Sequence, residues 1–381
     1  MKTLAVIGAG YLQLPLVTKA KQMGLRVICF AWPEGAVCAE VCDVFYPISI
    51  VDREKILEIC RSERVDGVTS IASDVAVPTI SYVAQKMGLV GNSVESAAKS
   101  TNKYLMRQAL WDAGVPCPKF VVVSEGENVS SCVDKMSFPL VVKPTDRSGS
   151  MGVTRVDHND ELGTAVTTAI SDSFCHKAIV EECITDMREI SVEGISWNGQ
   201  YHLLQITDKV TTGAPHYVEL AHHQPGCISE ELRNRIAEIV SRGISALDIR
   251  YGASHAELMI TSDDRVFVTE IGARMGGDFI GSDLVHLSTG YDFLEGVIKC
   301  ALGEFDGIRF GAHSRFSGVW FYAPQTRWVR DVINGRTAMQ NVDLVSCELQ
   351  SEDVVPLTRS ADRSGYFIYK SDIERFNPKG V

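Results

Sequence analysis

Short apolar runs alternate with longer amphipathic stretches over residues 1–95. Strand-like runs rich in β-branched residues occupy residues 4–7 and 26–30, and a helical pattern fills the stretch between them. Further elements of the same kind are expected as strands at residues 43–47 and 67–71 and as helices at residues 53–64 and 75–87. Strands that alternate with helices are typical of a parallel sheet with helices on its faces. The pattern therefore predicts an α/β domain over residues 1–95.

The pattern changes after residue 96. A helix is expected to start at Thr101 and Asn102, which are helix-capping residues, and to end at the Gly/Pro break of residues 114–118. Short strands then follow at residues 120–123, 140–143, 152–156 and 178–181, with one helix at residues 160–170. This mixture predicts a small α+β lobe at about residues 119–187. Short strands at residues 318–322, 344–349 and 366–369 predict a β-rich extension over residues 311–381.

A predicted hairpin brings two acidic residues together. Residues 253–260 and 266–268 are strand-like, and the polar residues 261–265 between them form a turn signal. The hairpin would place Glu257 beside Glu270, and two adjacent carboxylates repel each other unless a cation lies between them. Carboxylate oxygens of this kind suit Mg²⁺ that is carried with nucleotide phosphates. A surface hairpin with two solvated acids is the alternative interpretation.

Residues near this hairpin and in the small lobe could bind phosphate. Arg274 follows the hairpin and offers a planar donor fork for a phosphoryl or acyl-phosphate oxygen. Lys143 ends an apolar strand and is followed at once by a loop rich in Ser and Gly, whose backbone N–H groups can approach phosphate oxygens. The loop is not a Walker A sequence, so it does not imply a P-loop helix. A hairpin tip with a lysine that extends to solvent remains the other interpretation.

Composition narrows the class of protein. The net charge is −11 over 381 residues, which argues against nucleic acid or an anionic membrane as the main partner, so a phosphate site must be built locally. The 11 Cys residues show no paired CxxC spacing and fit reduced thiols of a cytoplasmic protein. No apolar run reaches the roughly 20 residues that a membrane helix needs, and no secretory signal precedes the first strand. We therefore expect a cytoplasmic protein.

The first strand is followed by an incomplete dinucleotide motif. Gly8 and Gly10 supply two glycines of GxGxxG, but Gln13 or Leu14 stands where the third is needed. No acidic residue ends the second strand, where the motif requires one to bind the ribose. The motif therefore favours a doubly wound scaffold over an NAD site.

These segments, in this order, resemble the ATP-grasp superfamily over roughly residues 1–310. The resemblance implies an ATP-grasp fold of mixed α/β and α+β class. A Rossmann-like preATP-grasp domain would occupy residues 1–95. The ATP-grasp domain would occupy residues 96–310, with a lid subdomain at about residues 119–187, and a C-terminal β extension would follow at residues 311–381.

The resemblance also implies residue roles. The expected ATP-binding residues are Lys103, Lys143, Ser148, Gly149, Ser150, Gly152, Glu181, Glu182, Ile184, Glu189 and Lys209. The lysines and the Ser/Gly loop would contact the phosphates, the segment from Glu181 to Ile184 would contact adenine through its backbone, and Glu189 would contact the ribose. Glu257 and Glu270 would hold Mg²⁺, with Mn²⁺ as an alternative ion. Gly272 stands where many members have a further ligand, Asn.

Within the superfamily, the likeness is to bacterial L-amino acid ligases and related carboxylate–amine ligases. It rests on a Glu-x-x-His element formed by Glu219 and His222, which would bind an amino acid. Asp278 lies where such ligases shape their substrate pocket, and an acid there suggests a cationic or amino-bearing substrate. Arg274 would serve both catalysis and substrate binding. His216, His223 and His255 receive no functional role.

The implied activity is ATP-dependent joining of a carboxylate, an amino acid in the first instance, to an amine (EC 6.3 class). An acyl phosphate would be the intermediate, and ADP and phosphate would be released. The partners would be small-molecule substrates, without nucleic acid or membrane, and a homodimer is left open. One alternative within the superfamily is a carboxylase or formyl-phosphate transferase of the purine or biotin type. Alternatives of other classes are an NAD-dependent oxidoreductase and a non-catalytic nucleotide-binding protein.

Overall fold

The N-terminal part of the chain is a parallel sheet with helices on both faces. The computed structural model describes residues 1–147, 151–213, 217–312, 315–337 and 339–378. Its first strands and helices are β1 (Thr3–Ile7), α1 (Leu14–Gln22), β2 (Arg26–Ala31), β3 (Val44–Pro47), α2 (Arg53–Ser62), β4 (Gly67–Thr69) and α3 (Val77–Met87). The four strands pair in parallel in the order β3-β2-β1-β4. The predicted α/β pattern is confirmed for this segment.

Alternation along β1 explains why helices cover both faces of this sheet. Leu4 and Val6 pack with α1, whereas Ala5 and Ile7 pack with α2 and α3. Successive side chains of a strand point to opposite faces, so a run of apolar residues must be covered on both sides. The sheet therefore has two cores, one on each face.

A pair of helices connects this sheet to the small lobe. They are α4 (Val94–Thr101) and α5 (Lys103–Asp112), and the Asn102 side chain accepts a hydrogen bond from Leu105 N at 3.1 Å. The predicted helix start at this Asn is confirmed. The lobe then consists of β5 (Phe120–Ser124), α6 (Val129–Cys132), β6 (Leu140–Pro144), β7 (Thr154–Val156), α7 (Asn159–Asp172) and β8 (Lys177–Glu182). Its antiparallel sheet has the order β5-β8-β6-β7.

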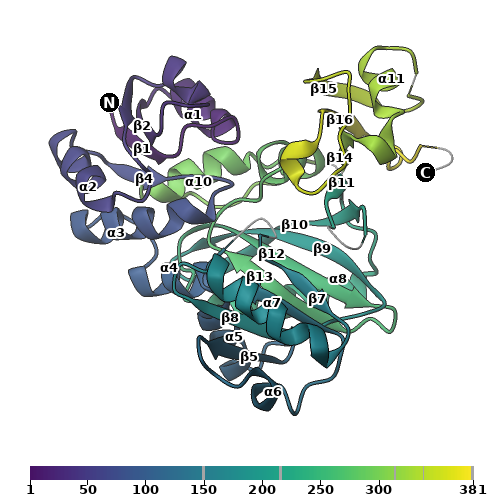
Figure 1. Ribbon diagram of the computed structural model, residues 1–381. Coiled ribbons are helices and arrows are strands. Elements are labelled where there is room, and N and C mark those ends of the chain that lie inside the picture. The colour runs from purple at the N-terminus through teal and green to yellow at the C-terminus, as the bar shows by residue number, and fades with distance from the viewer. Residues whose placement is uncertain (148–150, 214–216, 313–314, 338, 379–381) are drawn as a thin grey trace.

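The largest sheet has eight strands in the order β13-β12-β9-β10-β11-β14-β16-β15, all antiparallel. Their bounds are β9 (Met187–Trp197), β10 (Gln200–Thr211), β11 (Glu219–Gln224), β12 (Gly252–Thr261), β13 (Val266–Gly272), β14 (Phe316–Tyr322), β15 (Asp343–Leu349) and β16 (Gly365–Ser371). The associated helices are α8 (Glu230–Ala246), α9 (Val285–Thr289), α10 (Phe293–Ala301) and α11 (Val329–Ile333). Figure 1 shows α8 and α10 at different places against this sheet.

The two faces of the large sheet differ in chemistry. Ile190 and Val192 of β9, with Ala256 and Leu258 of β12, pack in the same core as the apolar side of α8. Because strand side chains alternate, the residues between them face the opposite side. That side carries Glu189, Glu193, Glu257 and other polar residues, so the sequence alternation separates a core face from a polar face.

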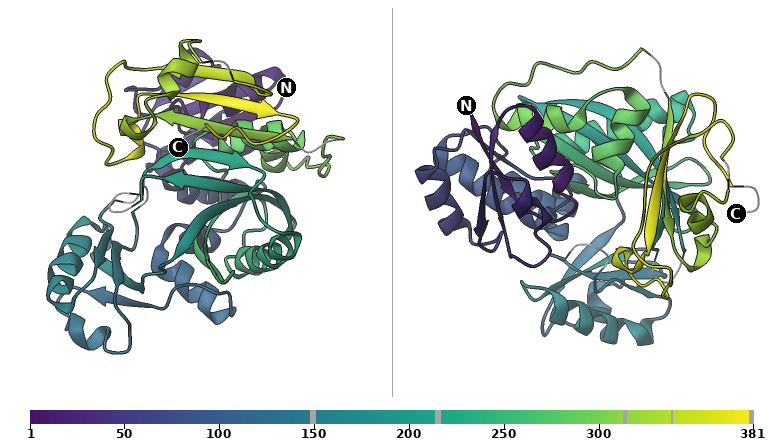
Figure 2. Two further views of the ribbon diagram at one scale, coloured as in Figure 1. Left: turned by 90° about the vertical axis from the view of Figure 1, so that its right-hand side faces the viewer. Right: turned by 90° about the horizontal axis from the view of Figure 1, so that it is seen from above.

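The C-terminal strands extend the large sheet. β14 pairs with β11 along its length, β16 pairs with β14, and β15 forms the outer edge. Of these strands, β14 lies beside β11, with β16 and then β15 farther out; Figure 2 shows the C-terminal strands in light green and yellow. The pairing satisfies the backbone groups that β11 would otherwise present at an open edge. The extension predicted from residue 311 is thus part of the main sheet, while the domain limits at residues 95 and 310 remain predictions.

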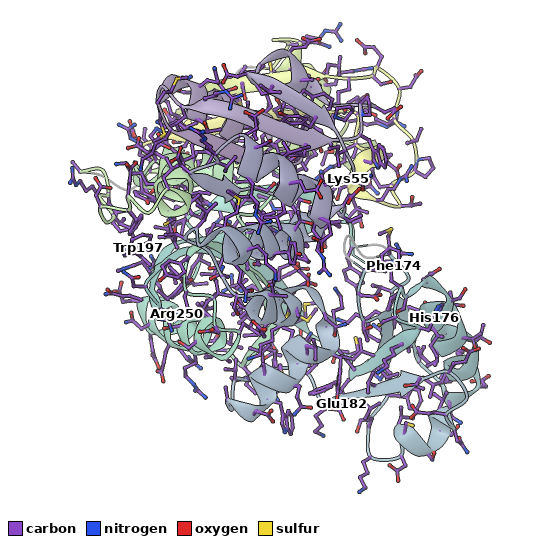
Figure 3. All side chains as sticks on the ribbon, turned by 90° about the vertical axis from the view of Figure 1, so that its left-hand side faces the viewer. Lys55, Phe174, His176, Glu182, Trp197 and Arg250 are labelled. Atoms are coloured by element: carbon purple, nitrogen blue, oxygen red, sulfur yellow. The ribbon has the colours of Figure 1, made fainter. Side chains whose placement is uncertain are left out.

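The small lobe lies to one side of the rest of the protein. Figure 3 labels Phe174, His176 and Glu182 on this lobe, with Trp197 and Arg250 on the unit that contains the large sheet. The residues between the end of β8 at Glu182 and the start of β9 at Met187 connect the two. Among the described residues, no helix is both long and apolar enough to cross a membrane.

Candidate functional site

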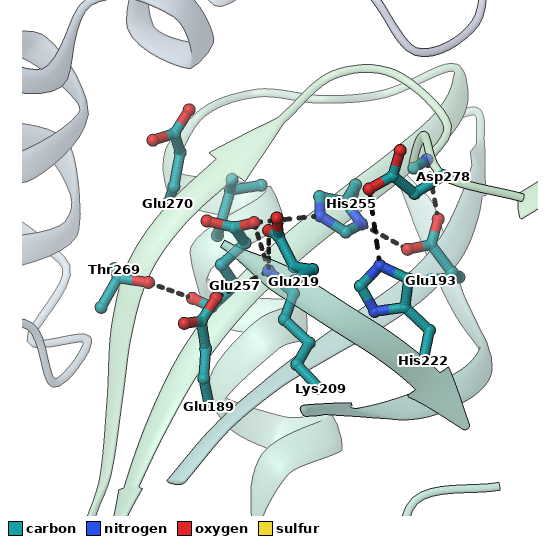
Figure 4. A network of polar contacts seen from close by, with 12 residues as sticks. Glu189, Glu193, Lys209, Glu219, His222, His255, Glu257, Thr269, Glu270 and Asp278 are labelled. Carbon is teal, nitrogen blue, oxygen red and sulfur yellow. Dashed lines mark hydrogen bonds and ion pairs between the residues drawn. The ribbon is translucent and has the colours of Figure 1, made fainter. Parts of the chain in front are cut away.

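The hairpin of β12 and β13 forms as predicted. Glu257 and Glu270 are direct partners in the antiparallel register, so their side chains point to the same face of the sheet. A register shift follows directly between Glu257 and Leu258, and Thr269 Oγ1 donates a hydrogen bond to Glu257 O at 2.9 Å. Figure 4 shows both carboxylates on the polar face. Their adjacency is confirmed, and their role as metal ligands stays a prediction.

A buried lysine lies among three carboxylates on that face. Lys209 Nζ is 2.6 Å from Glu189 Oε1, 2.6 Å from Glu257 Oε1 and 3.9 Å from Glu219 Oε1, and its side chain is only 2% exposed. Burial opposes ionisation of Glu257, but Lys209 and His255 outweigh it and hold the pKa of Glu257 well below its usual range. Burial raises the pKa of Glu189 despite the contact with Lys209. Three carboxylates carry more negative charge than one ammonium can neutralise, so this cluster would stabilise a further cation or ammonium group.

Two other lysines approach the same region from α5 and from the small lobe. Lys103 Nζ is 3.2 Å from Glu270 Oε2 and donates to Arg147 O at 2.7 Å. Lys143 Nζ is 2.6 Å from Glu181 Oε2, and burial lowers the pKa of Lys143. Lys103 therefore contacts Glu270 directly, whereas Lys143 is paired with Glu181 on the neighbouring strand β8.

The Ser/Gly loop after β6 is described only in part. Ser148, Gly149 and Ser150 lie outside the described residues. Gly152 has a φ of +69°, and a Cβ there would lie 2.8 Å from Pro144 Cγ. Because a positive φ and a close contact both exclude larger residues, the end of this loop needs glycine.

The segment predicted to contact adenine connects the small lobe to the large sheet. The Glu181 side chain is buried and lies between Arg107 and Lys143, so only its backbone remains for an adenine edge. Glu182 accepts hydrogen bonds from Lys119 Nζ at 3.2 Å and Ser137 N at 3.1 Å. Ile184 follows β8 in the connecting segment. Backbone contact with adenine stays a prediction.

Glu219 and His222 lie on β11, and Asp278 faces the histidine. His222 Nε2 is 3.6 Å from Asp278 Oδ2, and the imidazole is almost fully buried. Figure 4 shows this pair beside the Lys209 cluster. Glu219 Oε2 accepts a hydrogen bond from Ser360 Oγ at 3.2 Å. Glu219, His222 and Asp278 therefore lie close to Lys209, which is one of the residues predicted to bind ATP.

Arg363 of the C-terminal segment already provides Asp278 with a cation. Its Nη1 and Nη2 donate to the two carboxylate oxygens of Asp278 at 2.8 and 2.7 Å, and its guanidinium stacks 3.6 Å from the centre of the Phe321 ring. Burial would raise the pKa of Asp278, but Arg363 and His222 lower it strongly. The charge of Asp278 thus needs no cationic substrate. Arg363 was not predicted, because no motif surrounds it.

Arg274 is held from the N-terminal unit. Its Nε and Nη2 donate to Asp74 Oδ1 and Oδ2 at 2.9 and 3.0 Å. A Cβ at position 272 would lie 2.9 Å from Asp74 Oδ1, so Gly272 leaves the space that this pair occupies. The glycine in place of the family's Asn therefore has a local steric reason. Asp74 carried no sequence signal for this contact.

His255, which received no role, lies inside the carboxylate network. Its Nδ1 pairs with Glu193, and its Nε2 is 3.5 Å from Glu257 Oε1. Burial lowers the pKa of His255, but Glu193 and Glu257 outweigh it and raise that pKa to about 9. The signal available in the sequence was its position two residues before Glu257, on the same face of one strand. His223 instead packs against Tyr369, with Nδ1 2.9 Å from the phenol oxygen, and His216 lies outside the described residues.

Gln13 closes the turn of the incomplete dinucleotide motif. Its Oε1 accepts from Gly10 N at 3.1 Å, and its Nε2 donates to Ile71 O at 2.8 Å. Its side-chain amide carbon lies 3.1 Å from the position that a Cβ on Gly8 would take. A dinucleotide requires close approach to the glycine backbone at this turn, where the Gln13 side chain now packs. The turn therefore gives no support to the NAD-dependent alternative.

The carboxylate pair fits a Mg²⁺ ion. Mg²⁺ is usually bound through one or two carboxylates together with substrate phosphates. Among the described residues, no group of three or more His, Cys, Asp and Glu could form an all-protein metal cage. Glu257 and Glu270 are therefore the metal-ligand candidates, with Lys209 and Lys103 as their present partners.

Comparisons with known proteins agree with this arrangement. Residues 136–283 match the family model described as an ATP-grasp domain. Alanine–anticapsin ligase of Bacillus subtilis (strain 168) is 23% identical over 245 residues, which cover 59% of this chain and 51% of that protein. The chain thus spans about half the length of this curated relative.

Solved structures match nearly the whole chain. The L-amino acid ligase from Bacillus licheniformis superposes with a TM-score of 0.78 at 24% identity, covering 98% of this chain and 94% of that one. Phosphoribosylglycinamide synthetase from Anaerococcus prevotii superposes with a TM-score of 0.77 at 18% identity, covering 97% and 94%. Similarity at this level of identity shows the fold. Residues 136–283 are therefore an ATP-grasp domain, and the chain has the fold of the ATP-grasp superfamily.

Proposed function

We propose that this protein is an ATP-dependent carboxylate–amine ligase whose first substrate is an amino acid. The observation that carries the proposal is the facing pair Glu257 and Glu270, each paired with a lysine from a different segment, Lys209 of β10 and Lys103 of α5. Phosphoryl transfer depends mainly on positioning and on neutralising charge, which lysines, acids and glycine loops provide. The alanine–anticapsin ligase and the L-amino acid ligase among the similar proteins support the same reaction class.

The nucleotide would bind between the small lobe and the polar face of the large sheet. Lys103 and Lys143 would neutralise its phosphates, with the loop from Ser148 to Gly152 closing over them. The backbone from Glu181 to Ile184 would contact adenine, and Glu189 would accept hydrogen bonds from the ribose. Lys209 Nζ is 2.6 Å from Glu189 Oε1, so Lys209 would lie at the same end of the site.

Mg²⁺ would be held by Glu257 and Glu270 together with the triphosphate. When bound, the ion would supply charge neutralisation at the phosphates being transferred. Lys209 and Lys103 already balance these two carboxylates, so both lysines stay close enough to share the neutralisation.

Catalysis would then proceed in two steps. The substrate carboxylate attacks the γ-phosphorus of ATP, which releases ADP and forms an acyl phosphate. Arg274, whose guanidinium is held by Asp74, would bind the phosphoryl oxygens. The amine attacks the acyl carbon, phosphate leaves, and an amide-type bond forms. The small lobe would act as a lid that keeps water from the acyl phosphate.

Substrate recognition would fall to the residues around β11. Glu219 is suited to the ammonium group of the amino acid, and His222 to its carboxylate or to the nucleophile. The surplus of acids around Lys209 supports an ammonium-bearing substrate. Asp278 would act through its pairs with Arg363 and His222.

A screen of turnover tests the proposal. The protein is incubated with ATP and Mg²⁺, and ADP release is measured with each amino acid alone and with pairs of amino acids or small amines. The expected result is ADP release that depends on one amino acid and one amine, with a condensed product in stoichiometric amount. Turnover that requires bicarbonate or formate would point to the carboxylase or formyl-phosphate alternative. ATP binding without turnover in any combination would favour the non-catalytic alternative.

A further inference from the structure

One fully buried arginine plays no part in the reaction described so far. Arg107 lies on α5 with no exposed surface, and its Nε is 2.6 Å from Glu181 Oε1. The contact is an ion pair whose angles do not meet those of an aligned hydrogen bond. The guanidinium also donates to Thr269 O, next to Glu270 on β13. Arg107 therefore joins α5, the small lobe and the metal-candidate strand.

Glu181 is shared between two cations. Its Oε2 is 2.6 Å from Lys143 Nζ, while its other oxygen faces Arg107. Glu181 and Lys143 lie on neighbouring antiparallel strands, β8 and β6, where Lys143 pairs with Ile179 and Glu181 with Val141. Burial opposes ionisation of Glu181, but Arg107 and Lys143 outweigh it and lower its pKa. With all three side chains ionised, the group contains two cations and one anion; burial and Arg107 lower the pKa of Lys143, whereas Glu181 raises it.

This charge count decides what Lys143 can do. If Glu181 had only Lys143 as a partner, the two would cancel, and the lysine would offer little attraction to a triphosphate. A second buried cation beside Glu181 removes that cancellation. Charged groups inside a protein interact more strongly than in water, so the balance of this small group matters at the phosphate site.

We infer that Arg107 is a positioning residue for nucleotide binding, because its pairing with Glu181 keeps Lys143 available to the ATP phosphates. The inference rests on the proposed function, since it takes Lys143 as a phosphate-binding residue. Arg107 itself would touch neither the nucleotide nor the substrate. It acts through Glu181 on Lys143, and through Thr269 on the strand that carries Glu270.

The test measures the Kd for MgATP by titration calorimetry in the wild-type full chain, in three variants of this charge cluster and in one control variant. Arg107→Met removes the second cation and should weaken binding by about tenfold or more, since a tenfold change in Kd corresponds to about 1.4 kcal/mol. The double variant Arg107→Met/Glu181→Gln removes the anion as well and leaves Lys143 uncancelled. It should therefore recover most of the lost affinity. Arg107→Lys keeps the charge and should bind close to wild type.

The outcomes separate charge from packing. If the double variant binds no better than Arg107→Met, or if Arg107→Lys loses as much affinity as Arg107→Met, the charge role is wrong and Arg107 serves packing alone. If Arg107→Met binds like wild type, the inference also fails. Arg242→Met is the control for loss of an arginine elsewhere, because Arg242 is exposed and donates to Ala113 O and Gly114 O beyond the other end of α5. Failure of wild type itself to bind MgATP would instead overturn the proposed function.

Discussion

Asp74 holds Arg274 through two parallel hydrogen bonds, although 200 positions separate them in the chain. Asp74 belongs to the parallel N-terminal unit, whereas Arg274 follows the carboxylate hairpin. The contact therefore fixes a proposed catalytic side chain from a different part of the protein. Burial would lower the pKa of Arg274, but Asp74 outweighs it, so the guanidinium stays charged.

Removing this partner should impair turnover more than nucleotide binding. Asp74→Ala leaves Arg274 without its bidentate acceptor in a site where its side chain is 16% exposed. Breaking one side of a buried ion pair costs about 3–5 kcal/mol of unfolding free energy, and partial exposure places this site at the lower end. We expect a lower kcat with a near-normal Kd for MgATP, measured by ADP release and calorimetry. Asp248→Ala, which breaks an exposed pair with Arg250, is the control; equal effects of both would remove Asp74 from the mechanism.

Glu270→Gln should abolish turnover and leave the fold intact. The substitution keeps the size of the side chain but removes the charge that a metal ligand needs, and Glu270 contributes no packing to the core clusters of the described residues. Circular dichroism and ADP release would be measured together. Glu238→Gln on the exposed side of α8 serves as control. Near-normal ADP release by Glu270→Gln would show that its carboxylate does not bind Mg²⁺.

Glu219→Ala should raise the KM for the amino acid and leave the KM for ATP near its starting value. Loss of one charge-assisted contact in a partly buried pocket costs about 2–4 kcal/mol, which is tens- to several-hundred-fold in kcat/KM. Ser360→Ala removes only the hydroxyl that donates to Glu219, so its effect should have the same direction and be smaller. A variant that mainly weakens ATP would place Glu219 in the nucleotide site.

His223 should make the protein sensitive to acid. Burial lowers the pKa of His223 to about 3, from an ordinary value of 6.5. The folded state therefore favours the neutral ring, and its contribution to stability is complete above pH 6.5 and is lost as the pH falls towards 3. Chemical denaturation should show that the free energy of unfolding falls between pH 7 and pH 4, and that this fall is about 1–3 kcal/mol smaller in His223→Gln than in wild type. If the free energy of unfolding falls equally with pH in wild type and in His223→Gln, protonation of His223 is not coupled to unfolding.

Local patterns were enough to predict the hairpin and the main elements. Alternating apolar residues on both sides of a polar turn specify β12 and β13, and the short turn then fixes Glu257 near Glu270. The helix start at Asn102 was likewise predictable, because it depends on the capping side chain of that one residue. These features depend on residues that are close in sequence, so they can be predicted from local sequence patterns.

The supporting contacts could not be predicted in this way. Arg363 meets Asp278 across 85 positions, and Arg107 meets Glu181 across the junction of two lobes. Each is an ordinary charged residue with no motif around it, and its partner is chosen by tertiary packing alone. His255 is intermediate, because its place two residues before Glu257 was visible but its pairing with Glu193 was not.

The carboxylate hairpin and the C-terminal strands belong to one continuous sheet but lie at opposite ends of it. Substitutions at the two ends should therefore affect different parts of the proposed site. The carboxylate hairpin lies at one edge of the sheet, while β14 pairs with β11, the strand that carries Glu219 and His222, and β16 lies beyond β14. Substitutions in the last 70 or so residues can therefore reshape the proposed substrate pocket through Ser360 and Arg363 without touching the hairpin. Divergence of this tail would be a route by which related chains acquire new substrates while keeping the same phosphate chemistry.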